Sequence, residues 1–119
     1  MKYVDAYVIP LPRRKLKAYT AMARIGKKTW MKHGALEYME CVADDLKNPW
    51  AMDFTKLAKL KRGETLIVAF VVYRSRAHRD RVNAKVMKDP RLADMMDPKA
   101  MPFDAKRMIY GGFKVMVDL

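Results

Sequence analysis

Asp5 is the first residue of this sequence whose type and position point to chemistry. It lies between Tyr3 and Tyr7 in a stretch where two kinds of side chain alternate. A carboxylate removed from water is strongly disfavoured unless it is paired or hydrogen-bonded. Such a group can act as a general acid or base with a raised pKa. The competing interpretation is structural: a salt bridge at a subunit interface, or a polar residue lined by solvent.

His33 and Glu37 are two further, weaker catalytic candidates. If the strand faces are assigned correctly, Asp5 shares one cavity with Glu37, Cys41 and Tyr110, and His33 lies near its mouth at a helix-to-strand junction. A histidine beside a carboxylate is the commonest acid–base pair. A histidine at a helix end also interacts favourably with the helix dipole, which is the simpler explanation.

Arginine side chains provide a possible anion clamp. Arg74, Arg76 and Arg107 lie at the expected strand ends, and guanidinium groups match carboxylates and phosphates. Alternatively, Arg74 and Arg107 pair with Asp80 or Asp104 and fix loops. The residues predicted to bind a ligand are Asp5, Tyr7, Glu37, Arg74 and Tyr110.

The chain length and the cysteine count exclude several classes of protein. With 119 residues, the chain fits a single domain, which we predict over residues 1–119. Its one cysteine, Cys41, cannot form an internal disulfide, and one cysteine with two histidines does not make an ordinary zinc site. We expect no metal and no cofactor, and a buried, unreactive Cys41.

The charge balance and the hydropathy pattern bear on partners and location. No run of apolar residues is long enough to span a membrane, and the first residues lead into a strand pattern, so a cytoplasmic location is expected. The formal charge of +12, from 25 Lys and Arg against 13 Asp and Glu, could attract nucleic acid. However, the cations are dispersed along the chain, which suits a solvated surface equally well.

The elements that must position these residues are organised around residues 64–73. Within this stretch, residues 65–73 form an uncharged run rich in β-branched and aromatic side chains, which predicts a strand buried on both faces. Gly26 lies in the buried arc of the first amphipathic helix, which predicts a close approach to the strands there. Strands are predicted over 2–9, 35–43, 65–73 and 107–117, with a bulge or close approach at Gly111–Gly112, and helices over 13–32 and 75–88.

The order of these elements predicts an α+β, ferredoxin-like βαββαβ fold. In this fold a four-stranded antiparallel sheet carries both helices on one face. We expect Val4, Ala6 and Val8 under the helices, and the side of the first strand that carries Asp5 on the bare face. A bare face with large apolar side chains should find a partner, most simply a second copy of the chain.

Several segments of the sequence carry a family resemblance. They include 33–38, 72–76, 82–87, 89–92 and 106–113, of which the last, Lys106-Arg107-Met108-Ile109-Tyr110-Gly111-Gly112-Phe113, is the most specific. Together they resemble the bacterial YbaA-like family of unknown function, in the dimeric α/β-barrel superfamily. The resemblance spans nearly the whole chain and implies a homodimer in which two ferredoxin-like sheets face each other to form a barrel. It implies no established reaction.

Three functions are compatible with these observations. The first is a homodimer whose inter-sheet cavity binds, and in an enzyme would transform, a small organic molecule. The second is a basic nucleic-acid-binding module, and the third is a structural or regulatory dimer without a ligand. The sequence does not decide whether the protein is an enzyme.

Overall fold

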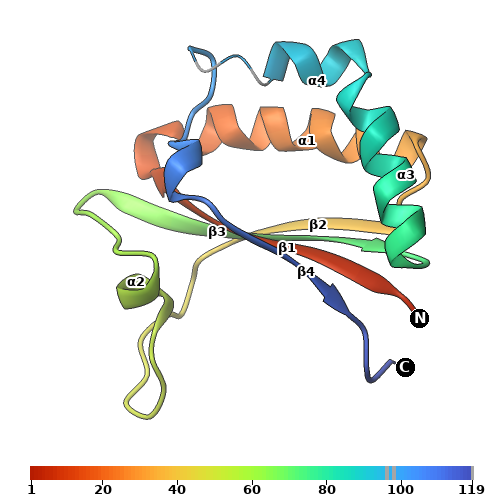
Figure 1. Cartoon of the computed structure of the whole chain (residues 1–119). Helices are drawn as coiled ribbons and strands as arrows, with labels where there is room; N and C mark the ends of the chain where they lie inside the picture. The colour runs from red at the N-terminus through yellow and green to blue at the C-terminus, as the bar shows by residue number, and fades with distance from the viewer. Residues whose placement is uncertain (96, 98, 119) are drawn as a thin grey trace.

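Strand β3 (Glu64–Tyr73) lies inside a four-stranded antiparallel sheet, as its apolar sequence predicts. It pairs with β1 (Tyr3–Pro12) on one side and with β2 (Glu37–Val42) on the other. Strand β4 (Ile109–Lys114) pairs with β1, so the strand order is β2-β3-β1-β4 (Figure 1). The predicted ferredoxin-like fold is confirmed, and in the single chain the sheet is open. The computed structural model describes residues 1–95, 97 and 99–118.

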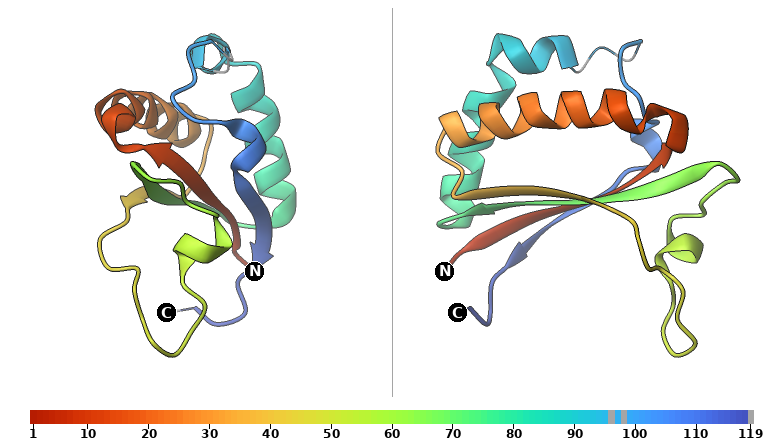
Figure 2. Two further views of the ribbon diagram at one scale, coloured as in Figure 1. Left: turned by 90° about the vertical axis from the view of Figure 1, so that its left-hand side faces the viewer. Right: turned by 180° about the vertical axis from the view of Figure 1, so that it is seen from behind.

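Helices α1 (Leu16–Lys32) and α3 (Arg76–Met87) cover one face of the sheet, and α4 (Pro90–Met95) lies over α1 (Figure 2). The start of α3 follows from the sequence, because the Ser75 hydroxyl accepts a hydrogen bond from the His78 backbone N–H at 3.1 Å. The remaining short helical segments are α2 (Phe54–Leu57), in the long loop on the opposite side, and the 3₁₀ turns η1 (Arg13–Lys15) and η2 (Ala105–Arg107).

Strand β1 is longer than predicted, because it continues through two prolines. Pro10 lies opposite Leu66 and Pro12 lies opposite Glu64 of β3. On its other side, β1 pairs with β4 only as far as Val8. The later part of β1 therefore has a free edge, where a residue without an N–H is tolerated.

Gly26 allows the close approach of α1 to the sheet that the sequence predicts. A Cβ atom added at this position would lie 2.7 Å from the hydroxyl oxygen of Tyr38 on β2 and 3.7 Å from the terminal methyl of Met95. A real Cβ atom is not found this close to another heavy atom. The glycine therefore gives the Tyr38 side chain space beneath the helix.

The predicted orientation of the sheet is wrong, since the helices cover its other face. Tyr3 and Asp5 are buried on the helix side, whereas Val4, Ala6 and Val8 point away from the helices. Alternation with a period of two separates the faces of a strand but does not show which face is covered. The large aromatic side chains fill the space under the helices. Asp5 pairs there with Arg79 of α3, a partner that the sequence of β1 alone does not reveal.

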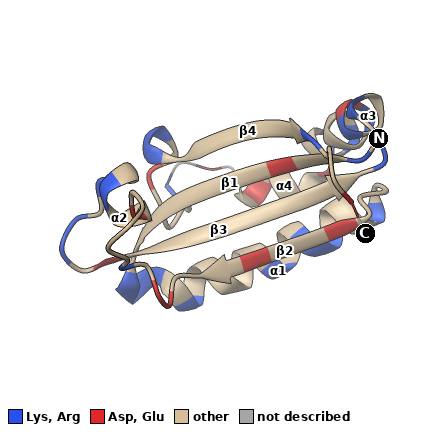
Figure 3. Ribbon diagram, turned by 90° about the horizontal axis from the view of Figure 1, so that it is seen from below, with Lys and Arg blue, Asp and Glu red and all other residues tan. Residues whose placement is uncertain are grey.

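The open face of the sheet is largely apolar. Met39, Ile109 and Phe113 are 52%, 40% and 59% exposed on it. The register places no Lys or Arg among the strand residues of this face (Figure 3). The strand residues on this side also include Val4, Ala6 and Val8 of β1, Val68 and Phe70 of β3, and Glu37 and Cys41 of β2.

Candidate functional site

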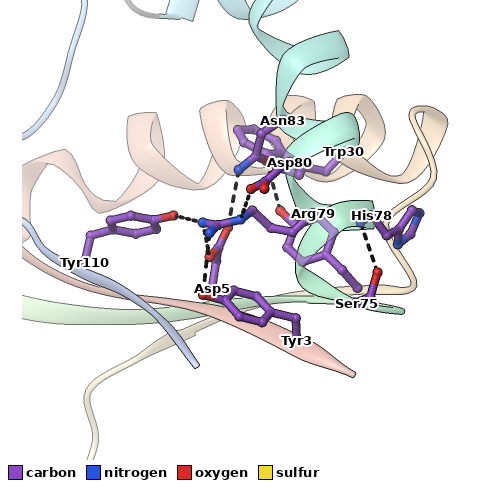
Figure 4. Close-up of polar contacts among 10 residues, drawn as sticks. Tyr3, Asp5, Trp30, Ser75, His78, Arg79, Asp80, Asn83 and Tyr110 are labelled. Carbon is purple, nitrogen blue, oxygen red and sulfur yellow. Dashed lines mark hydrogen bonds and ion pairs between the residues drawn. The ribbon is translucent and has the colours of Figure 1, made fainter. Parts of the chain in front are cut away.

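A buried ion pair joins β1 to α3. Asp5 is 0% exposed, and Nη1 of Arg79 donates a hydrogen bond to its Oδ1 at 3.0 Å. The same nitrogen donates to the Tyr110 hydroxyl at 2.7 Å, and the guanidinium carbon lies 4.9 Å from the centre of the Tyr3 ring. The Nε atom forms an ion pair with Asp80 at 2.9 Å. Figure 4 shows these side chains converging from β1, β4 and α3.

Asn83 extends this cluster to α1 and β3. Its Nδ2 donates to Asp5 Oδ2 at 3.4 Å, and its Oδ1 accepts from Trp30 Nε1 and from the Tyr73 hydroxyl, both at 3.1 Å (Figure 4). Both carboxylate oxygens of Asp5 therefore have donors. The cluster connects two strands of the sheet centre to the two helices that cover them.

The geometry gives Asp5 a structural role. Burial alone would lower the pKa of Arg79, but the charge of Asp5 and the phenols of Tyr110 and Tyr3 raise it, so the guanidinium stays charged beside the carboxylate. A general acid or base must reach its substrate. Asp5 instead forms a salt bridge with Arg79. This is the structural interpretation given above, except that the salt bridge lies within one chain and not at a subunit interface.

The predicted candidate His33 takes part in a tie between two helices. His33 follows the last residue of α1, and its Nε2 lies 2.8 Å from Oδ2 of Asp89, which precedes α4. Asp89 Oδ1 accepts a hydrogen bond from the Arg91 backbone N–H at 3.0 Å, at the start of α4. The hydrogen bond from His33 is the main cause that lowers the pKa of Asp89.

The predicted arginine clamp does not assemble. Arg107 makes two hydrogen bonds to Glu64, at 2.6 and 2.9 Å, in place of the expected pairing with Asp80 or Asp104. Arg74 and Arg76 are exposed and form no ion pair with any residue that the structure describes. Glu37 is exposed on the open face, opposite to Asp5, Tyr7 and Tyr110. The expected single cavity for these residues is therefore wrong.

A cavity of about 250 Å³ lies between the sheet and the helices, beside the Asp5 cluster. Tyr7 belongs to it, and Met22 and Met95 also line an outer groove of about 620 Å³ between α1 and α4. These two methionines thus form part of the wall between the cavity and the surface. The other aromatic, acidic and methionine side chains of the lining are Tyr19, Trp30, Tyr38, Glu40, Met87, Met101, Phe103 and Met108.

Glu40 is the acidic residue of this cavity. It follows Tyr38 by two residues on β2, so both side chains point to the helices. The Tyr38 hydroxyl donates to Glu40 Oε2 at 2.6 Å, and the Tyr19 hydroxyl donates to Oε1. Burial, together with the charge and the hydrogen bond of Glu40, raises the pKa of both tyrosines, so both remain protonated donors.

Tyr7 supplies a further polar atom to the cavity. Its ring lies 4.9 Å from that of Tyr110, centre to centre. Burial is the main cause that raises the pKa of Tyr7, and Asp5 adds to it. The Tyr7 hydroxyl forms no hydrogen bond with the residues that the structure describes, so it is available to a bound molecule.

Arg79 and Glu40 are the two central residues that sequence reasoning missed, and each had a signal. Arg79, Val82, Asn83 and Val86 recur at helical spacing and form the inner face of α3. Glu40 shares a strand face with Tyr38, whereas Glu37 alternates to the other face. Choosing between the two glutamates required knowing which face the helices cover.

Other kinds of site find no support in the described part of the chain. Residues 1–95, 97 and 99–118 contain no group of three or more His, Cys, Asp or Glu placed to hold a metal ion. Over the same residues, no helix is long and apolar enough to cross a bilayer. Cys41 is exposed on the open face of the single chain, where a buried thiol is expected from the sequence.

Comparison with known proteins identifies relatives over the whole chain. Residues 2–105 match the family described as "Protein of unknown function (DUF1428)". The chain is 39% identical over 118 residues to "Uncharacterized protein YbaA" of Escherichia coli K12, covering 99% of both chains, and equally similar to YbaA of Shigella flexneri. Among solved structures, "De novo designed protein Foldit4" is similar with a TM-score of 0.46 and 9% identity, covering 97% of this chain and 99% of that one.

Proposed function

We propose that this chain, which belongs to the family of proteins of unknown function DUF1428, binds a small organic molecule in the cavity between its sheet and its helices. The observation that carries the proposal is the Glu40 carboxylate, which faces a space lined mainly by aromatic and methionine side chains. Binding sites for small molecules are typically apolar cavities with a few convergent polar groups. Here those groups are Glu40 and the Tyr7 hydroxyl.

Glu40 also defines the chemistry that a reaction in this cavity would use. A carboxylate with free lone pairs can take a proton from a bound molecule and return it. The two tyrosines hold the carboxylate in one orientation through their hydrogen bonds. A reaction at this site would therefore be an acid–base step at Glu40.

The cavity can be tested with 2-phenylethanol as a neutral probe. Trp30 lines the cavity and Trp50 is 85% exposed, so a Trp50→Phe background leaves Trp30 as the reporter. We expect saturable changes in Trp30 fluorescence, and their loss in Ala69→Met, which places a longer side chain into the cavity from β3. Ala84→Met, at an exposed position of α3, is the matched control. No saturable change up to the solubility limit, with this probe or with the cationic and anionic analogues introduced below, would overturn the proposal.

We further propose that a second copy of the chain covers the open face. The exposed side chains of Met39, Ile109 and Phe113, and the absence of strand cations there, support this arrangement. Phe113→Glu should then yield a monomer by sedimentation velocity. Met31→Glu, at a similarly exposed apolar position of α1 on the other side, should not. A wild-type chain that sediments as a monomer would contradict the homodimer. The cytoplasmic location stays a prediction.

A further inference from the structure

We propose that the molecule bound in the cavity carries a protonated amine that lies against Glu40. This inference rests on the proposed function and specifies the chemical class of the ligand. It follows from three features of the cavity: a carboxylate without a cation, a surround of aromatic rings, and acceptor atoms that the protein leaves unused.

Glu40 differs from Asp5, Glu64 and Asp89 in having no cationic partner, and from the partly buried Asp53, whose carboxylate instead caps α2 by accepting a hydrogen bond from the Lys56 backbone N–H. Asp5 pairs with Arg79, Glu64 with Arg107, and Asp89 with His33 and Arg91. Among the residues that the structure describes, Glu40 forms no ion pair, although the chain contains 25 Lys and Arg against 13 Asp and Glu. The chain has many cations, yet the partly buried Glu40 carboxylate is hydrogen-bonded only by the two tyrosine hydroxyls among the described residues. We therefore infer that its cationic partner is a bound ligand.

The aromatic lining favours a cation in the same place. Trp30 and Tyr38 lie 5.9 Å apart between ring centres, at an interplanar angle of 42°. Tyr19 and Phe103 lie 5.9 Å apart at 67°, and Tyr7 adds a fifth ring. The faces of Trp, Tyr and Phe attract ammonium groups, and the attraction grows when water is excluded. A carboxylate within a set of such rings suits an ammonium group better than a neutral or anionic one.

The hydrogen-bonding capacity of the site matches a protonated amine. A carboxylate can accept about four hydrogen bonds, and two of those of Glu40 are taken by Tyr19 and Tyr38. An ammonium group brings up to three donors, which the free lone pairs of Glu40 and the Tyr7 hydroxyl oxygen can accept. A carboxylate on the ligand would face Glu40 directly and be repelled.

The volume limits the size of the amine. About 250 Å³ lies below the usual range of pockets that hold drug-sized molecules. The polyvalent character of spermine-like amines is also unsuited to a lining with a single carboxylate. The expected ligand is therefore an amine on one ring or a short apolar chain.

Three probes of similar size and different charge test the inference. Phenethylamine is cationic, 2-phenylethanol is neutral and 3-phenylpropionate is anionic at pH 7. In the Trp50→Phe background, titrations followed by Trp30 fluorescence should give a Kd for phenethylamine at least tenfold below that of 2-phenylethanol, as expected for about 1.4 kcal/mol from one charge-assisted contact. Binding of 3-phenylpropionate should be the weakest.

Glu40→Gln should remove the preference for the amine while 2-phenylethanol still binds. Glu37→Gln is the matched control, since it neutralises the other glutamate of β2 on the opposite face, and it should keep the preference. Retained binding of 2-phenylethanol also shows that the Glu40→Gln variant is folded. If that binding is lost, Glu40→Asp replaces it, and the shortened carboxylate should reduce the preference.

The outcomes separate this inference from the proposed function. Equal binding of the amine and the alcohol, or a preference that survives in Glu40→Gln, would overturn the ammonium assignment and leave a small-molecule cavity. Binding of none of the three probes would overturn both. A tenfold preference that depends on Glu40 alone would support both.

Discussion

The helix-covered face of the sheet carries a carboxylate in each of two regions, and their surroundings differ. At one end, Asp5 is fully buried and receives donors from Arg79 and Asn83. In the cavity, Glu40 is partly accessible, and within the described part of the chain it receives hydrogen bonds only from two tyrosine hydroxyls. A carboxylate such as Asp5, whose charge and hydrogen bonds are satisfied within the chain, stabilises the fold. One whose charge is left unmatched is available to a ligand.

The largest expected effect is on the Asp5 region. Asp5→Asn removes the negative charge and leaves the Arg79 guanidinium, 14% exposed, without its buried partner. Breaking a buried ion pair from one side should lower the free energy of unfolding by about 3 kcal/mol, measured by urea denaturation. Asp80→Asn removes the more exposed carboxylate next to the same guanidinium and should cost less than about 1 kcal/mol. Equal losses in both variants would contradict the structural role of Asp5.

A glycine in β4 gives a second test of the same region. A Cβ atom at Gly112 would lie 2.3 Å from the Tyr3 hydroxyl oxygen and 2.7 Å from Cε2 of its ring, next to Arg79. Gly112→Ala should therefore displace Tyr3 and lower the stability by about 2 kcal/mol. At neighbouring Gly111 the closest contact would be 3.5 Å, to the Phe113 ring, so Gly111→Ala should be nearly neutral in thermal unfolding. A neutral Gly112→Ala would show that Tyr3 is free to move.

A smaller effect is expected in the cavity. Glu40→Gln keeps an acceptor for one tyrosine. It also removes a negative charge, but no ion pair within the described residues is broken, because Glu40 forms none there. Its stability should change by no more than about 1 kcal/mol in urea denaturation, even though its ligand preference is lost. A loss as large as that of Asp5→Asn would mean that Glu40 also serves the fold.

The smallest expected effect is a pH dependence of the free energy of unfolding that arises from His78 of α3. Burial, and then the charges of Arg74, Arg81 and Lys85, lower the pKa of His78 from its ordinary value of 6.5. Its Nδ1 accepts the Arg74 backbone N–H at 3.0 Å, a bond that protonation of this nitrogen would remove. As the pH falls below 6.5, the unfolded chain binds a proton that the folded chain does not, so stability decreases.

The variant that isolates this dependence is His78→Asn, which retains an acceptor near the Nδ1 position. It should flatten the decrease in the free energy of unfolding between pH 7 and the lowered pKa. An unchanged slope would assign the titration to another group.

The sequence predicted the elements of the fold well because their signals are local. The uncharged run over residues 65–73 became β3, which begins one residue earlier, at Glu64; Ser75 caps α3 as expected, and Gly26 marks a real close approach to β2. Each of these signals depends on neighbours in the sequence or on a steric need at one position. The βαββαβ topology then followed from the order of the elements.

The site was predicted less well, because it depends on which sheet face the helices cover. Strand alternation placed Asp5 with Tyr7 and Tyr110, which the structure confirms, but put them on the wrong side. Because the wrong face was expected to be covered, the predicted cavity contained Glu37, whereas the cavity under the helices contains Glu40. The covered face is identified only by contacts between residues distant in the sequence, such as that between Arg79 and Asp5, 74 positions apart in the chain.

The position of the cavity relative to the open face has a consequence for stoichiometry. A pocket formed between two sheets would be shared by both subunits, and occupation of one half would affect the other. The Glu40 cavity is lined within one chain, on the side of the sheet that faces away from Met39 and Phe113. Two associated copies would thus hold two complete and separate pockets, with one molecule per chain at saturation and a hyperbolic binding curve.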